Sequence, residues 1–219
     1  MDTVHAAPRA SDPPPATSPG ASPEAPQATA YRPPASLPPS PNRTLAVGWH
    51  DLAPVLARAA RERGVDVLRA IGAGALPAPP LHHLLGIENV LVEEGRVAFT
   101  LVPREAHYNP MGAVHGGVLA ALLDSAMGCA VYSTLPAGTG YTTTDLQVRY
   151  VRPATEATGA LRAEGTAVHT GATTAVAEGR VTDVRGRLVA HATEGCLILP
   201  GWGRPRDAAT APHGPPPPG

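Results

Sequence analysis

The chain of 219 residues contains no lysine, so its 17 basic side chains other than histidine are all arginine. Acidic and basic residues are mixed along the chain, and the formal net charge is only -1. Such a balance lacks the block of positive charge that attracts nucleic acids or anionic membrane surfaces. We therefore expect neither nucleic acid nor a membrane as a partner, and we attribute the arginines to a composition that is also rich in Ala, Gly and Pro.

Cysteine is scarce as well, since only Cys129 and Cys196 occur and both lie in apolar segments. They show neither a CxxC pair nor the Cys and His spacing of a zinc site, and no glycine-rich nucleotide loop occurs. The beginning of the sequence lacks a basic start followed by an apolar stretch, and no run reaches the ~20 apolar residues of a membrane span. We expect reduced core thiols, a cytoplasmic protein, no metal and no cofactor.

Proline is concentrated at the two ends, since 19 of the 27 prolines lie before position 45 or after position 199. Those ends also contain few of the aromatic and β-branched residues that a folded segment would bury. The sequence therefore predicts a disordered arm over residues 1–45 and a disordered tail over residues 201–219. Between them we expect a helical extension over residues 46–80 and one domain over residues 81–200, because a chain of this length supports a single sizeable core.

The helical extension is predicted from its periodicity. Apolar residues recur at helical spacing between positions 52 and 60, with arginine and glutamate between them. Asp51 is expected to cap the start of this short helix, and Gly64 is expected to end it. A second short helix is expected over residues 65–71, before the prolines at 77, 79 and 80 interrupt the chain.

The domain is predicted to combine one long helix with several strands. The longest helix candidate covers residues 117–134 and is apolar on most sides, so we expect it to be buried. A helical turn is expected at 81–86, and strands are expected at 87–93, 96–103, 141–151, 158–170, 173–183 and 187–199. The short turns between the strands indicate an antiparallel sheet. This succession predicts an α+β hotdog fold, in which a curled antiparallel sheet wraps a long buried helix.

The start of the long helix carries the sequence His115-Gly116-Gly117. The first amides of a helix lack intrahelical acceptors and carry the positive end of the helix dipole, so they can stabilise a developing oxyanion. Glycine lets a substrate carbonyl approach these N–H groups. In hydrolases each such donor stabilises the transition state by about 3–4 kcal/mol. We interpret the glycines as a candidate oxyanion site, and tight helix contacts alone are the alternative.

Asp124 lies on the same helix among nearly exclusively apolar neighbours. Burying a carboxylate there is costly unless it has partners or a chemical task. A structural ion pair or a cap within a dimer interface is the alternative. Eight residues separate Asp124 from Gly116, which is about 12 Å along a helix axis, so one chain cannot place both on one carbonyl. Two antiparallel helices related by a two-fold axis can do so. The spacing therefore predicts a homodimer with shared active sites.

An ordered set of motifs resembles one known family. Asn109 precedes His115-Gly116-Gly117, Asp124 follows nine residues after the histidine, and Thr142-Thr143-Thr144-Asp145 leads into a strand that ends Tyr150-Val151-Arg152-Pro153. Over residues 84–199 this set is similar to the PaaI-like hotdog thioesterases. The resemblance implies hydrolysis of an acyl- or aryl-coenzyme A by Asp124, acting as general base on water or as the nucleophile that forms a mixed anhydride.

The resemblance also implies roles for the residues before the long helix. The Gly116 amide would polarise the thioester carbonyl, and Asn109 and His115 would help to hold the substrate and the loop. A histidine that is a simple cap or a core residue is the alternative for His115. A turn former before Pro110 is the alternative for Asn109.

In the threonine run, Thr143 stands where members of this family place a hydroxyl that positions the water. The run leaves the register open by one residue, so Thr142 or Thr144 could be the equivalent instead. Strict strand alternation would put Thr143 and Asp145 on one face and the other two threonines on the opposite face.

In such enzymes coenzyme A lies in a groove at the subunit boundary. Gly117, Arg152 and the turn at Thr170-Gly171 are our candidates for substrate-binding residues, and a solvated turn residue is the alternative for Arg152. Hotdog dimers commonly pair again, so the resemblance implies a homotetramer.

Two other functions remain open at this point. A hotdog enoyl-CoA hydratase would use a His and Asp pair, which sequences of that kind place differently. A non-catalytic module would bind an acyl-CoA, or would bind a partner protein through the proline-rich arms.

Overall fold

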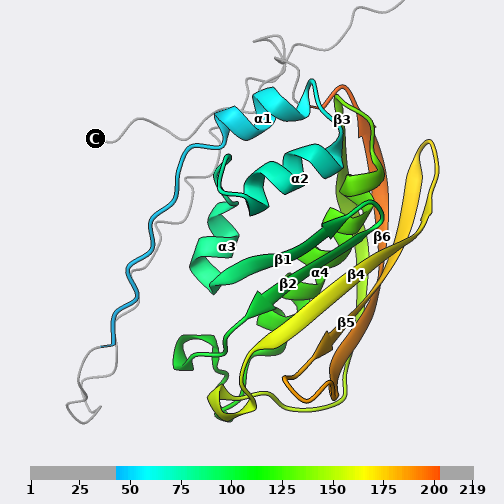
Figure 1. Ribbon diagram of the computed structural model, residues 1–219. Helices are drawn as coiled ribbons and strands as arrows, with labels where there is room; N and C mark the ends of the chain where they lie inside the picture. Colours follow the sequence, from blue (N-terminus) through cyan, green and yellow to red (C-terminus); the bar gives the residue numbers. More distant parts are fainter. Residues whose placement is uncertain (1–42, 203–219) are drawn as a thin grey trace, which may run out of the picture. The chain divides into compact units, whose positions relative to one another are not determined.

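The computed structural model describes residues 43–202, and the predicted disordered arm (1–45) and tail (201–219) lie almost wholly outside them. A compact unit begins at Thr44. In chain order its elements are α1 (Ala53–Ala59), α2 (Gly64–Gly72), α3 (Pro80–Leu85), β1 (Ile87–Glu93), β2 (Arg96–Leu101), η1 (Glu105–His107), α4 (Gly116–Thr134), β3 (Thr139–Tyr150), η2 (Glu156–Thr158), β4 (Leu161–Thr170), β5 (Thr174–Thr182) and β6 (Leu188–Pro200) (Figure 1). The two η elements are single 3-10 turns.

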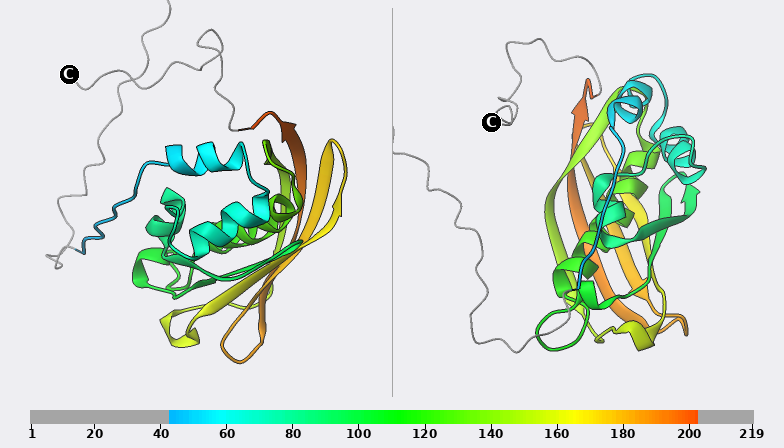
Figure 2. Two further views of the ribbon diagram at one scale, coloured as in Figure 1. Left: turned by 45° about the horizontal axis from the view of Figure 1, so that its top comes forward. Right: turned by 90° about the vertical axis from the view of Figure 1, so that its left-hand side faces the viewer.

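The six strands form one antiparallel sheet in the order β1-β2-β4-β5-β6-β3, so β1 and β3 are its edges. The sheet curls around α4, and this helix contacts all six strands (Figures 1 and 2). The curl does not close into a barrel, since β1 and β3 do not pair with each other. A long helix held by a curled antiparallel sheet is the α+β hotdog fold predicted from the sequence, and that prediction is confirmed.

Helix α4 is the centre of the core because its side chains are apolar nearly all round. Leu122, Leu123 and Met127 are fully buried. The strand beneath the helix makes room for it, since a Cβ at Gly165 of β4 would lie 2.4 Å from the carbonyl oxygen of Ala126. By length and composition α4 could also cross a membrane, but in this fold the same apolar residues fill the core under the sheet.

The predicted helical extension is present as α1 and α2, with one correction. Helix α1 ends at Ala59, and Gly64 begins α2 instead of ending α1. The Gly64 N–H donates to the Leu135 carbonyl at 3.1 Å, and a Cβ at Gly64 would lie 1.9 Å from the Tyr132 carbonyl oxygen. Glycine is therefore required here by close contact with the end of α4, a cause that local sequence does not reveal.

The predicted cap of α1 is also displaced by one residue. Leu52 occupies the N-cap position, and no side chain caps it. The Asp51 carboxylate instead accepts a hydrogen bond from the Ala53 amide at 3.0 Å, from one position further out.

Strand boundaries agree with the sequence within one or two residues except at β4. The strand predicted over residues 158–170 begins only at Leu161, because Glu156–Thr158 form the turn η2. Gly159 follows with a φ of +76°, a conformation that glycine adopts without strain.

Candidate active site

One backbone N–H at the start of α4 has no hydrogen-bond acceptor in the part of the chain that the structure describes. His115 is the N-cap residue, and its Nδ1 accepts a hydrogen bond from the Gly117 amide at 2.9 Å. This contact matches the cap considered for His115, and it occupies the Gly117 N–H. Within residues 43–202 the Gly116 N–H has no hydrogen-bond acceptor. Gly116 is therefore the better placed of the two glycines to bind an oxyanion.

The loop before α4 is held by Asn109. Its Oδ1 accepts hydrogen bonds from the Met111 amide at 2.9 Å and from the Ala113 amide at 3.3 Å. Its backbone N–H donates to the Ala113 carbonyl at 2.8 Å. Asn109 thus forms the turn that brings the chain back to the helix start, and its side-chain oxygen is fully used for this purpose.

A cavity of about 390 Å³ lies at the start of α4. Its lining residues are Asn109, Ala113, Val114, Gly116, Leu119, Tyr150, Val151, Arg152, Pro153 and Ala154. Three of the predicted site residues, Asn109, Gly116 and Arg152, therefore come together here. The Arg152 guanidinium donates to the Leu188 carbonyl at the rim of this cavity.

Tyr150 is a cavity residue to which the sequence assigned no role. Its hydroxyl donates to the Gly116 carbonyl at 2.9 Å, and a Cβ at Gly116 would lie 3.1 Å from its ring. The end of β3 thus holds the glycine that carries the uncovered amide. The position was visible in the sequence as the tyrosine that precedes Val151-Arg152-Pro153.

Asp124 lies half-buried in the middle of α4. Its Oδ1 is 2.9 Å from the Thr143 Oγ1 of β3, close enough for a hydrogen bond. Within residues 43–202 of one chain this carboxyl forms no ion pair. The contact with Thr143 instead joins the helix to the edge strand of the sheet.

A β-bulge in β3 decides which threonine faces Asp124. Thr143 is opposite Cys196 and Asp145 is opposite Gly195, so Thr144 is the extra residue. The prediction that Thr143 and Asp145 share a face is therefore wrong, because a bulge reverses the alternation beyond it. Thr143 faces the helix, while Asp145 lies exposed on the outer face and accepts a hydrogen bond from Thr144 at 3.2 Å.

Glu194 of β6 is a second acid near Asp124, and the sequence did not identify it as a site residue. It is 1% exposed, and its Oε1 lies 3.0 Å from Thr143 Oγ1. Cys196 donates to the same oxygen at 3.2 Å. Burial raises the pKa of the Glu194 carboxyl to about 7, against the lowering effect of the Cys196 and Thr143 hydrogen bonds. Period-2 alternation with Ala190, Ala192 and Cys196 would have placed this acid on the apolar face of β6.

The two cysteines lie in the same region as this pair of acids. Burial raises the pKa of the Cys129 thiol to about 12 and raises the pKa of Cys196 further still. Both thiols are free and are held in the protonated form at neutral pH. This agrees with the interpretation of both cysteines as reduced thiols of the core.

Thr170 and Gly171 lie at the other end of α4 from the cavity. Thr170 Oγ1 is 3.1 Å from Thr134 Oγ1, and Thr134 is the last residue of the helix. A helix of this length separates Thr134 from Gly116 by about 27 Å along its axis. Within one chain, therefore, the Thr170-Gly171 turn does not line the cavity at Gly116, and its role as a substrate-binding turn stays a prediction.

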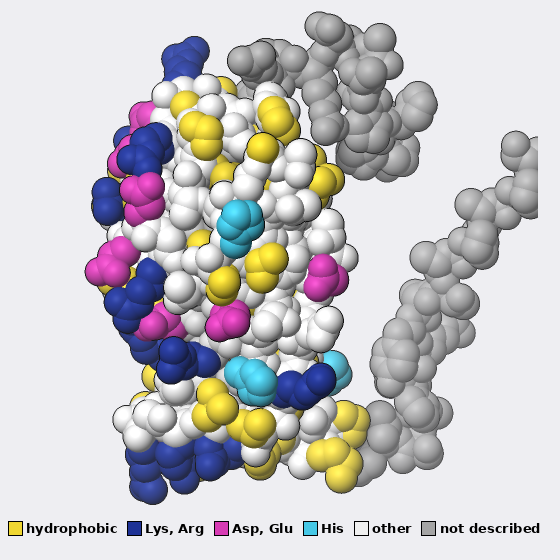
Figure 3. All heavy atoms as spheres, turned by 90° about the vertical axis from the view of Figure 1, so that its right-hand side faces the viewer, with side chains coloured by type: hydrophobic (Ala, Val, Ile, Leu, Met, Phe, Trp, Pro, Cys, Tyr) yellow, Lys and Arg dark blue, Asp and Glu magenta, His cyan; other side chains and the backbone are white. Residues whose placement is uncertain are grey.

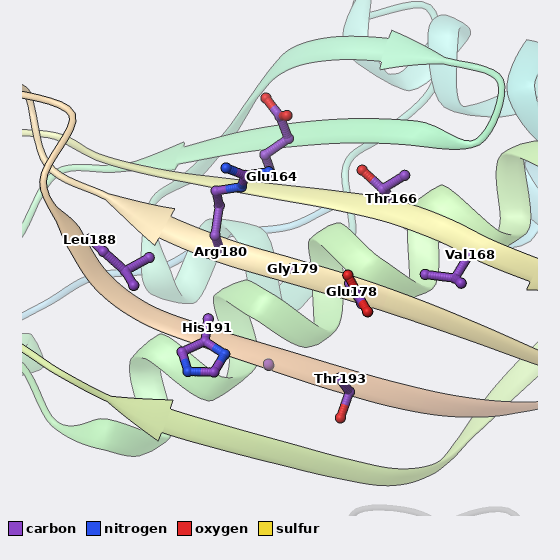
Figure 4. A pocket seen from close by; sticks show the side chains of 10 residues that line it. Glu164, Thr166, Val168, Glu178, Gly179, Arg180, Leu188, His191 and Thr193 are labelled. Carbon is purple, nitrogen blue, oxygen red and sulfur yellow. The ribbon is translucent and has the colours of Figure 1, made fainter.

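A second cavity, of about 520 Å³, lies on the outer face of the sheet. Figure 4 shows its side chains on β4, β5 and β6, with α4 behind the strands. Its lining residues are Glu164, Thr166, Val168, Glu178, Gly179, Arg180, Leu188, His191, Ala192 and Thr193. The sheet separates this cavity from Asp124 and Gly116. The face of the molecule drawn in Figure 3 carries acidic and basic side chains interspersed with one another. We therefore place the candidate active site at α4.

Possible metal ligands do not cluster anywhere in the part of the chain that the structure describes. Within residues 43–202 no group of three or more His, Cys, Asp or Glu side chains is arranged to hold an ion. The acids around α4 meet a hydroxyl and a thiol instead.

Comparison with known proteins identifies the family. The sequence model of the thioesterase superfamily matches residues 111–190, which include the start of α4, Asp124 and Thr143. A protein of Halobacterium salinarum described as an esterase is 38% identical over 105 residues, which cover 44% of this chain and 68% of that protein. The chain belongs to the thioesterase superfamily.

Solved structures place this thioesterase-superfamily member among the PaaI-like hotdog proteins. A Ralstonia eutropha protein described as a thioesterase related to phenylacetic acid degradation is 30% identical, with a TM-score of 0.55, and covers 59% of this chain and 97% of its own. The PaaI protein of Escherichia coli is 21% identical, with a TM-score of 0.56, and covers 67% of this chain and 98% of its own. At that identity the second comparison supports the fold alone. The resemblance to the PaaI-like family is confirmed.

Proposed function

We propose that this protein hydrolyses an acyl- or aryl-coenzyme A thioester to the free acid and coenzyme A. Membership of the thioesterase superfamily supports thioester hydrolysis in general. The observation that carries the proposal is the pair of groups on α4, an uncovered amide at Gly116 and the Asp124 carboxyl held by Thr143. Inclusion of aryl thioesters is supported by the relative from Ralstonia eutropha, whose description names phenylacetic acid degradation.

Each group has a defined task in this reaction. The Gly116 N–H binds the thioester oxygen and stabilises the negative charge that develops when the carbonyl carbon is attacked. Asp124 either removes a proton from the attacking water or attacks the carbon itself. The C–S bond then breaks, and the coenzyme A thiolate leaves and takes up a proton. In the nucleophilic route water subsequently cleaves the mixed anhydride and restores the carboxylate.

We further propose that two chains share each site. Asp124 and Gly116 are too far apart along α4 to act on one carbonyl, and the helix start of a second chain can supply the missing amide. Strand β3 supports such an assembly, because it is an edge strand whose free backbone groups can pair with a second copy.

The function is tested by release of free thiol from a panel of acyl- and aryl-coenzyme A thioesters. We expect release above the uncatalysed rate for at least one member of the panel. Binding of a thioester in calorimetry without release of thiol would favour the non-catalytic module. Hydration of an enoyl-coenzyme A without thiol release would favour the hydratase.

The shared site predicts rescue between two inactive variants. Asp124→Asn and Gly116→Val chains that are mixed in equal amounts and allowed to exchange form heterodimers with one intact and one doubly damaged site. Random exchange makes half of the dimers mixed, so we expect about a quarter of the wild-type rate. Sites built from a single chain would give no rescue once mass spectrometry has shown that mixed dimers are present.

A further inference from the structure

We propose that Glu194 is a positioning residue that carries a proton in the resting protein and directs the Thr143 hydroxyl toward Asp124. Its effect on the rate rests on the proposed function. The protonation itself rests on the geometry of the three side chains and can be tested without a substrate.

Thr143 has one hydroxyl proton for two neighbouring carboxyls, so either Asp124 or Glu194 must be protonated. Thr143 Oγ1 is 2.9 Å from Asp124 Oδ1 and 3.0 Å from Glu194 Oε1, but a hydroxyl has one proton to donate. With two ionised carboxylates, one contact would place lone pairs against each other at about hydrogen-bonding distance, which is repulsive. One of the two acids must therefore donate to Thr143, and the hydroxyl then donates to the other.

Burial decides which acid is neutral. Glu194 is 1% exposed, and its Oε2 is buried without a hydrogen-bond partner. If Glu194 were ionised, part of its negative charge would lie on Oε2, buried and without a partner. If Glu194 is protonated on Oε1, Oε2 is only a neutral carbonyl oxygen. Asp124 is partly exposed on the helix. The proton therefore belongs on Glu194.

The groups around Glu194 favour the same assignment. Asp124 and Cys129 lie near it on α4, Thr143 and Tyr141 on β3, and Cys196 on its own strand. The charge of Asp145 acts on it from the outer face of β3. None of these is basic, and within residues 43–202 Glu194 forms no ion pair. Cys196 donates to Oε1, the oxygen that also lies next to Thr143. The charges of Asp124 and Asp145 add to burial in raising the pKa of Glu194.

The order of hydrogen bonds then runs in one direction. Glu194 Oε1–H donates to Thr143 Oγ1, and Thr143 O–H donates to Asp124 Oδ1. Loss of the Glu194 proton leaves two carboxylates competing for one hydroxyl, so Asp124 loses its oriented partner. We expect the ionised form to be the slow form, with the rate falling as pH rises through about 7.

The experiment combines infrared spectra with pH-rate profiles for three proteins. They are the wild type, Glu194→Gln, and the matched control Glu178→Gln, which makes the same change on the exposed outer face of β5. The wild type and the control should show the carbonyl stretch of a protonated carboxyl that disappears as pH rises through about 7. Glu194→Gln should lack this band, since its amide donates to Thr143 at every pH.

The pH dependence of the rate should also distinguish Glu194→Gln from the wild type and the control. In the wild type and the control, kcat/KM should fall roughly tenfold over the two pH units around the midpoint of the band. In Glu194→Gln the same interval should be flat, which a merely structural role would not produce. A fall that is unchanged in Glu194→Gln, or a band that persists in it, would overturn the proposal.

The test remains decisive if the variant does not fold or if no thioester is hydrolysed. If Glu194→Gln does not fold, Asp124→Asn replaces it in the infrared measurement. Removing the Asp124 charge should move the loss of the band to lower pH, and an unmoved band would overturn the proposal. If no thioester releases thiol while the band behaves as stated, the proposed function fails and the protonation of Glu194 is supported.

Discussion

Replacement of Asp124 by asparagine is expected to lower kcat/KM for coenzyme A thioesters by a factor of about 10²–10⁴, the usual contribution of a positioned acid or base. Asparagine keeps an oxygen that can accept the Thr143 hydrogen bond, so the contact at 2.9 Å has a substitute. What is lost is the negative oxygen that removes a proton from water or attacks the carbon. Rates of thiol release at several substrate concentrations measure the loss.

The matched control for this variant is Asp145→Asn. Asp145 lies on the exposed outer face of β3 beyond the bulge, close in sequence to Thr143 but turned away from α4. Assayed well below pH 7, where Glu194 stays protonated with or without the Asp145 charge, this variant is expected to keep the wild-type rate. Asp124→Asn is expected to keep the wild-type melting temperature. Equal rates from wild type and Asp124→Asn would remove Asp124 from the mechanism.

Replacement of Gly165 by alanine is expected to destabilise the fold by about 3 kcal/mol or more, at or above the upper end of the cost of added volume in a core. The new Cβ would lie 2.4 Å from the Ala126 carbonyl carbon and oxygen and 2.6 Å from the Met127 amide nitrogen. These are backbone atoms of α4, so the helix must shift as a body, because no side chain can rotate away.

Urea unfolding measures this effect. Gly48→Ala is the matched control, since a Cβ there has no atom within 4 Å, and we expect it to change stability by less than about 0.5 kcal/mol. The shift of α4 in Gly165→Ala should also lower the rate, because Asp124 moves with the helix. An unfolding free energy within about 0.5 kcal/mol of the wild type would show that α4 and β4 are less closely held than the distances indicate.

The long helix and the strands were predictable because their signals are local. Residues 117–134 are apolar on most sides, and a helix of this kind has to be enclosed in a single-sheet protein, so α4 at the centre of a curled sheet followed from composition alone. The same holds for the amides at the start of α4, since every helix start lacks acceptors. Gly64 was misread because its requirement for glycine comes from the Tyr132 carbonyl, far away in sequence.

The site was only partly predictable, and β3 shows the reason. Strict alternation places Thr143 and Asp145 together, but a single extra residue at Thr144 reverses the alternation. Such a bulge is decided by how β3 pairs with β6, which no local pattern in the threonine run reveals. Glu194 was missed for a related cause, because its importance depends on reaching the same hydroxyl as Asp124 from another strand.

The sequence by itself determined the hotdog class, the position of the acid on α4 and the glycine-marked start of that helix, because helical periodicity and backbone chemistry act over a few residues. The tertiary structure decided that Thr143 is the threonine that faces Asp124, that Tyr150 holds Gly116, and that Glu194 reaches the same Thr143 oxygen as Asp124. These relations join α4, β3 and β6, and strand pairing is set by the whole sheet, which is why they became visible only in three dimensions.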